Sequence, residues 1–145
     1  QRLLIGPLPA PVWPNGLQLE AFRDHHAQAV HALLHCAYER GGGSVAPFYQ
    51  WWPSLRGDCE YDPALCFVVW DSEGVPVGVA QCWTSAFVKD LAVHPRQRGR
   101  GVGTALLLQT FGAFQTRGAG AVSLKVQADN ASAMRLYERM GMVAV

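Results

Sequence analysis

The sequence has no long apolar run and almost no net charge. None of its apolar stretches approaches the roughly 18 residues that a membrane-spanning helix needs. The formal net charge of +1 argues against a general nucleic-acid-binding protein. We therefore expect neither a membrane nor a nucleic acid as a partner, and the length of 145 residues favours a single domain over residues 1–145.

Cysteine is scarce and its spacing is not that of a metal site. The four cysteines are Cys36, Cys59, Cys66 and Cys82, and no C-x-x-C occurs. His31 and His35 are one helical turn apart, but no third ligand stands at a recognisable spacing. We expect reduced thiols in a cytoplasmic protein, and no metal.

The glycine-rich turn after residue 95 lacks the spacing of two common phosphate-binding motifs. A P-loop counted from Gly99 needs a second glycine, followed by lysine, where Thr104 stands. The dinucleotide-binding fingerprint needs a glycine at that same place. Neither a P-loop nucleotide site nor a dinucleotide site is therefore expected.

Residues 89–107, KDLAVHPRQRGRGVGTALL, read as a strand, a basic turn and the start of a helix. Leu91 and Val93 alternate as on one face of a strand, and Pro95 ends the pairing because it has no N–H. From Thr104 the apolar spacing is helical. Glycines let an anion approach the free N–H groups of a helix start, and arginines add positive charge, so the stretch predicts a phosphate cradle.

The rest of the chain alternates between strand and helix patterns. Residues 1–16 contain four prolines and are expected to be an irregular arm. Strands are predicted near 17–21, 65–70, 75–83, 87–93 and 122–126, and helices near 24–40, 47–56, 102–116 and 131–140. This order predicts an α/β fold with a mixed, mostly antiparallel twisted sheet of about six strands and helices on both faces.

Two motifs resemble those of the GNAT superfamily of N-acetyltransferases. Residues 91–103 fit L-x-V-x-P followed by R-x-x-G-x-G, and residues 130–141 fit N-x-x-A-x-x-L-Y-x-x-x-G. The two motifs stand in the family's order, and the resemblance is strong over residues 88–142. Over residues 17–87 it consists only of the order of the elements.

The resemblance implies a sheet that is splayed at a cleft for acetyl-CoA. The pyrophosphate would be held by Arg98, Gly99, Arg100, Gly101, Val102, Gly103 and Thr104. The pantetheine arm would pair with Leu91, Ala92 and Val93, with Asn130 and Tyr137 on its other side. A backbone N–H of the Leu91–Val93 strand would polarise the thioester carbonyl.

The resemblance also implies a catalytic role for Tyr137, whose phenol would protonate the leaving thiolate. A phenol has a pKa of about 10, above the roughly 8.5 of a thiol, so it carries the proton at neutral pH. The attacking amine needs a base, for which Asp90 is the candidate. Strand alternation places Asp90 opposite the face of Leu91, and Lys89 stands where some relatives carry a glutamate.

The predicted reaction is transfer of an acetyl group from acetyl-CoA to a primary amine, by direct attack in a ternary complex. The alternative is a CoA-binding regulatory module without catalysis. Residues 40–64, which would decide the acceptor, contain no motif. Because residues 1–82 hold eight acidic and four basic side chains, and the aromatic run PFYQWW spans 47–52, we expect a small cationic amine rather than a protein. These aromatic side chains could equally belong to the core.

Family members continue past the last helix with one or two strands. Here only residues 142–145 remain, so the far edge of the sheet is expected to be incomplete unless another chain supplies it. An exposed strand edge favours association, and a homodimer is therefore among the expectations.

Overall fold

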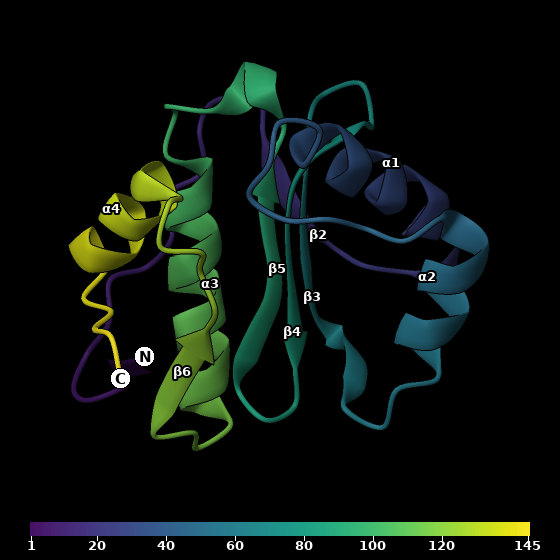
Figure 1. The fold of residues 1–145 in the computed structure, drawn as a ribbon. Coiled ribbons are helices and arrows are strands. Elements are labelled where there is room, and N and C mark those ends of the chain that lie inside the picture. The colour runs from purple at the N-terminus through teal and green to yellow at the C-terminus, as the bar shows by residue number, and fades with distance from the viewer.

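Six strands form one sheet in the order β1-β6-β5-β4-β3-β2 in the computed structural model, which describes residues 1–145 (Figure 1). The strands are β1 (Arg2–Leu3), β2 (Gln18–Ala21), β3 (Tyr61–Trp70), β4 (Pro76–Trp83), β5 (Phe87–Val93) and β6 (Ala121–Leu124). The helices are α1 (Ala27–Ala37), α2 (Phe48–Arg56), α3 (Val102–Thr116) and α4 (Ala131–Arg139), with short 3-10 turns at Asp24–His26 and Pro95–Gln97. All neighbouring strands are antiparallel except β5 and β6, which are parallel and joined through α3. The predicted mixed, mostly antiparallel sheet is confirmed.

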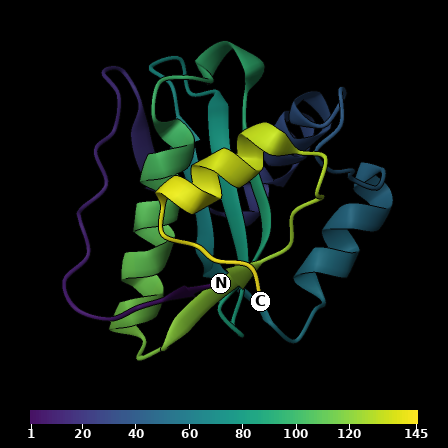
Figure 2. The ribbon, with the colours of Figure 1, turned by 60° about the vertical axis from the view of Figure 1, so that its left-hand side comes forward.

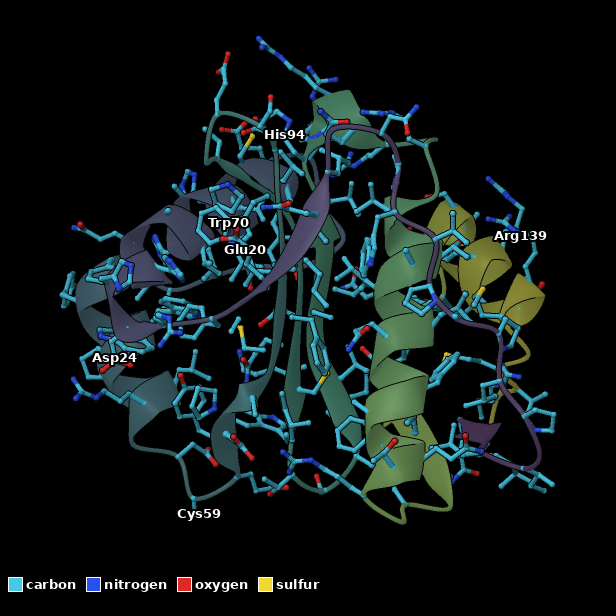
Figure 3. All side chains as sticks on the ribbon, turned by 180° about the vertical axis from the view of Figure 1, so that it is seen from behind. Glu20, Asp24, Cys59, Trp70, His94 and Arg139 are labelled. Atoms are coloured by element: carbon cyan, nitrogen blue, oxygen red, sulfur yellow. The ribbon has the colours of Figure 1, made fainter.

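The helices cover both faces of the sheet, with α1 and α2 on one side and α3 and α4 on the other (Figure 1). Alternating side chains of the strands build a core on each side. Phe67 and Val69 of β3 pack in the core that includes α3, while Val68 and Trp70 pack in the core that includes α1 and α2. Figure 3 shows Trp70 on this second side and Arg139 of α4 on the first.

The first turn of α3 lies directly on β4 because Gly78 has no side chain. A Cβ at Gly78 would lie 2.8 Å from Val102 Cγ1 and 3.2 Å from Leu106 Cδ1. Such distances leave no room for a methyl group. The close packing places the N-terminus of α3 beside the end of β5.

The N-terminal residues form an edge strand within the segment that was expected to be an irregular arm. Arg2 and Leu3 pair with Val122 and Ala121 of β6. The N-terminal amino group of Gln1 donates to the carbonyl of Val143 at 2.8 Å, and the two termini lie side by side (Figure 2). A strand of two residues is too short to show alternation, so it could not be predicted from the sequence pattern. Residues 142–145 form no strand, and β1 occupies the edge beside β6.

The sheet is splayed between β5 and β6. These strands pair only at Phe87↔Ser123 and Val88↔Leu124, and they separate beyond that point. On the other edge of β5, the β4 ladder continues to the hydrogen bond from His94 N to Val77 O at 2.8 Å. Since alternate residues of an antiparallel strand face its partner, the N–H and C=O groups of Leu91 and Val93 point away from β4, into the gap.

Candidate active site

A cleft of about 730 Å³ opens where β5 and β6 separate. Its floor is the end of β5, from Leu91 to Val93. One wall is the C-terminal end of α1 with the glycine loop that follows it, residues 37–42, and the opposite wall is α4. The turn before α3 and the first residues of that helix close one end.

The turn before α3 presents a row of free N–H donors to the cleft. Gly99 and Gly101 have φ of 78° and 86°, a left-handed conformation that favours glycine. The first backbone hydrogen bond of α3 runs from Ala105 N to Gly101 O, at 3.0 Å. None of the six N–H groups of residues 99–104 donates to another group of the chain. Five of these free donors belong to residues that line the cleft, and together with the positive end of the helix dipole they are the features expected of an anion-binding site.

Charged side chains give the cleft a positive balance. Arg40, Arg98 and Arg139 line it, and Asp129 is the one acidic side chain among the lining residues. Arg40 belongs to the α1 wall and Arg139 to α4, so cations stand on opposite sides. This arrangement favours a ligand with several negative charges.

Arg98 and Arg100 are both predicted pyrophosphate ligands, but their guanidinium groups donate hydrogen bonds to other residues of the chain. Arg98 donates from Nε to Val93 O at 3.2 Å and from Nη2 to Ala37 O at 3.0 Å, so it ties the end of β5 to the end of α1. Arg100 does not line the cleft. Its guanidinium donates to the side chain of Gln97 and, at 3.2 Å, to the carbonyl of Asn15.

The α4 wall is set by its cap and by a glycine of α3. Asn130 caps α4, because its Oδ1 accepts from Ala133 N at 3.3 Å. A Cβ at Gly103 would lie 3.2 Å from Leu136 Cδ2, so this glycine lets α4 pack closely on α3. Tyr137, half-buried on α4, lines the cleft, and burial raises the pKa of its phenol. The phenol of Tyr137 therefore carries its proton at physiological pH.

Asp90 does not line the cleft. As strand alternation predicts, its side chain lies on the α1 side of β5, where it is 11% exposed. Its Oδ1 accepts a hydrogen bond of 2.8 Å from the hydroxyl of Tyr38, and its Oδ2 lies 3.2 Å from Lys89 Nζ. The carboxylate is thus held on both oxygens by other side chains.

The structure brings eleven of the twelve predicted cofactor residues together around one cleft, Arg100 being the exception. Sequence reasoning missed the wall formed by Tyr38, Arg40, Gly41 and Gly42. The glycine run after α1 was the available signal, since Gly41 and Gly42 have φ of 102° and 87°. No pattern in the sequence pointed to Tyr38.

The aromatic run at residues 47–52 is part of α2 and packs mainly in the core. Trp51 is 7% exposed, and Phe48 and Trp52 pack against the same core, whereas Tyr49 is 76% exposed. None of these residues lines the cleft.

No group of three or more His, Cys, Asp or Glu side chains is placed to hold a metal ion. The four cysteines are unpaired, and Cys66 and Cys82 are buried. No helix has the length and apolar character required to cross a membrane.

The cleft fits the chemistry of acyl-CoA. A pyrophosphate needs several N–H donors and positive charge, which residues 99–104 and the lining arginines supply. An extended chain with amide groups needs a free strand edge. Leu91 offers its N–H and C=O and Val93 its N–H, whereas Val93 O accepts from Arg98 Nε.

Known proteins share the sequence pattern and the fold. The model of the acetyltransferase (GNAT) family matches residues 20–142. Mycothiol acetyltransferase of Thermobispora bispora is 30% identical over 158 aligned positions, which cover 97% of this chain and 51% of that protein. The chain thus spans about half the length of this relative.

Among solved structures, a GCN5-related N-acetyltransferase from Sphaerobacter thermophilus superposes with a TM-score of 0.82 at 28% identity, covering 98% of this chain and 46% of that one. The NatC complex bound to a Gag peptide and CoA gives a TM-score of 0.71 at 17% identity, covering 89% and 86%. Since the family model matches most of the residues, this chain belongs to the acetyltransferase (GNAT) family.

Proposed function

We propose that the chain transfers an acetyl group from acetyl-CoA to the primary amine of a small molecule, by direct attack in a ternary complex. The observation that carries this proposal is the meeting of three features in one cleft. These features are the free edge of β5, the row of N–H donors before α3, and the phenol of Tyr137.

Each feature has a part in holding acetyl-CoA. The N–H groups of residues 99–104 would hold the pyrophosphate, together with the positive charge of Arg98. Leu91 and Val93 would pair with the amides of the pantetheine arm, as an added strand does. Asn130 and Tyr137 would enclose the arm from α4. Arg100 would act through the turn, which its hydrogen bonds to Gln97 and Asn15 help to fix.

The chain's own groups then supply the catalysis. The bound thioester provides the acetyl group as the electrophile. A free N–H of the Leu91–Val93 segment would stabilise the oxyanion, as a single donor of an oxyanion hole. Tyr137 would donate its proton to the sulfur as the C–S bond breaks, which is general acid catalysis. Asp90 would be the base that takes up a proton from the attacking amine.

Two observations support a small acceptor. The name of the relative from Thermobispora bispora, mycothiol acetyltransferase, points to an acceptor of low molecular weight. The first 82 residues, which include the α1 wall and Asp90's partner Tyr38, carry eight acidic and four basic side chains. This excess of acid in the first part of the chain would favour a cationic amine, although the charged side chains that line the cleft itself are mostly basic.

One observation favours the second candidate, a CoA-binding module without catalysis: no carboxylate that could act as a base reaches the cleft directly except Asp129 at the α4 cap. A panel of amines incubated with acetyl-CoA separates the two. We expect thiol release above background with small cationic amines, and lower release from Tyr137→Phe. Calorimetry with CoA runs in parallel: tight binding without thiol release for any amine would establish the module, and absence of binding would contradict both candidates.

A further inference from the structure

We propose that Tyr38 is a catalytic residue that takes a proton from the attacking amine and passes its own proton to Asp90. This inference rests on the proposed acetyl transfer. The relay would connect Asp90 to the cleft. Asp90 does not line the cleft itself, because its side chain lies on the face of β5 opposite Leu91.

Tyr38 lies between the carboxylate and the cleft. It is the C-cap of α1, and it lines the cleft, whereas Asp90 does not. Its hydroxyl donates to Asp90 Oδ1 at 2.8 Å. A phenol oxygen that donates its proton still has lone pairs that can accept an N–H from a ligand. The pair therefore offers a two-step path from the cleft to a carboxylate.

The pair is held in place from several sides. A Cβ at Gly43 would lie 2.9 Å from two ring carbons of Tyr38, so the glycine loop packs against the ring. Arg98 fixes the carbonyl of Ala37, the residue before Tyr38, at 3.0 Å. Lys89 holds the second oxygen of Asp90. A relay needs groups held in such fixed positions.

The titratable neighbours leave the phenol neutral. Burial, with Asp90 next in importance, raises the pKa of Tyr38, so it can pass a proton on but does not remain ionised. Tyr137 faces it from α4 and contributes to the same increase of its pKa. On the strands, Lys89 is paired with Asp90, and burial raises the pKa of the Cys66 and Cys82 thiols, the latter to about 12. Arg98, fixed on the Ala37 carbonyl, and Arg40 are the charged side chains of this wall that line the cleft, and His94 lies 3.8 Å from Cys36 Sγ near the same end of α1.

The proton balance of the reaction is complete. An N–H proton of the ammonium passes to Tyr38 Oη while the phenol proton passes to Asp90 Oδ1. The nitrogen lone pair forms the C–N bond at the thioester carbonyl, the C–S bond breaks, and the sulfur takes the proton of Tyr137. The ammonium loses two protons in all: one leaves Asp90 to solvent, and the other replaces the proton that Tyr137 gave up.

The test compares Tyr38→Phe, Asp90→Asn and the double variant with the wild type. Tyr49→Phe is the matched control, because Tyr49 is 76% exposed on α2 and away from the cleft. The measurements are kcat/KM against pH and CoA affinity. The acceptors are the best amine of the panel and an analogue whose fluorine beside the amine lowers its basicity.

We expect Tyr38→Phe to lower kcat/KM at neutral pH by about 100-fold or more, the range of general acid–base catalysis, with CoA affinity unchanged. The deficit should shrink as pH rises, and it should be smaller for the fluorinated amine, since both changes supply neutral amine without a base. The double variant should be no slower than the slower single variant, because the two residues act as one unit. Tyr49→Phe should match the wild type.

An unchanged kcat/KM for Tyr38→Phe would overturn the relay. A deficit that is the same at every pH and for both amines would assign Tyr38 a purely structural role, and multiplicative losses in the double variant would show that the residues act separately. A wild type that binds CoA but releases no thiol with any amine would overturn the proposed function itself. Thermal melts of each variant show whether a loss reflects unfolding.

Discussion

Gly101 and Gly118 flank α3 and offer a matched pair of substitutions. Their φ values are 86° and 84°, and at both positions no atom beyond the adjacent residues lies within 4 Å of where a Cβ would stand. An alanine therefore contacts nothing at either site, and its cost is the left-handed backbone alone, about 1–2 kcal/mol. For a chain of this length we expect each single variant to melt about 3–8 °C below the wild type.

The two variants should differ in CoA binding. Gly101 lines the cleft, within the row of free N–H donors, whereas Gly118 lies at the other end of the helix. A methyl group at residue 101 would keep an anion from the N–H groups beside it. Losing one charge-assisted hydrogen bond costs about 1.5–3 kcal/mol, so Gly101→Ala should weaken CoA binding by roughly 10- to 150-fold. Gly118→Ala should bind CoA as the wild type does.

Calorimetric titration of CoA into the three proteins, together with thermal melts, tests this reasoning. Equal CoA affinities in both variants would refute the anion site at the start of α3. Unequal melting temperatures would refute the claim that the substitutions cost backbone strain alone. Gly101→Asn separates the effects further, because asparagine tolerates a left-handed backbone better than alanine does. It should recover stability without recovering affinity.

Three further predictions concern packing and charge. Gly78→Ala should cost about 1–3 kcal/mol in denaturant unfolding, since its Cβ would lie 2.8 Å from an α3 methyl; no cost would mean that α3 shifts freely. Gly43→Ala should displace the ring of Tyr38, because the new Cβ would lie 2.9 Å from it. We expect kcat/KM to fall roughly 10- to 100-fold at unchanged CoA affinity, and full activity would mean that the loop moves instead. Arg117 donates to Asp62 at 2.8 Å and lowers the pKa of that carboxyl, so the pair stabilises above about pH 4 and loses its effect as pH falls through the lowered pKa. Both side chains are partly exposed, so Arg117→Ala should cost at most about 1 kcal/mol in neutral melts and less in acid; a larger loss in acid would contradict this sign.

The sequence predicted α3 well, because both of its ends carry strong local signals. Its predicted range, residues 102–116, is the observed one. Glycines with positive φ stand directly before it, at Gly101, and close after it, at Gly118. The prediction of a phosphate cradle came from the same turn, since free N–H groups at a helix start are a local property.

Features that depend on distant segments could not be predicted. β1 consists of two residues that pair with a strand about 120 positions away, and local periodicity does not predict such a contact. Arg100 shares its motif with Arg98, yet the two guanidinium groups turn to different partners. The direction of a long side chain in a loop depends on the surrounding fold, which the motif does not contain.

Asp90 shows how a correct local rule gives an incomplete account of a site. Alternation along β5 places its carboxylate on the face opposite Leu91, which is the α1 side, and the structure agrees. But α1 packs on this same face and ends where the cleft opens, so a side chain at its C-cap can touch both the carboxylate and the cleft. Tyr38, 52 residues from Asp90 in the chain, occupies that position. The rule identified the face of one strand, whereas the chemistry depends on what the neighbouring helix brings to that face.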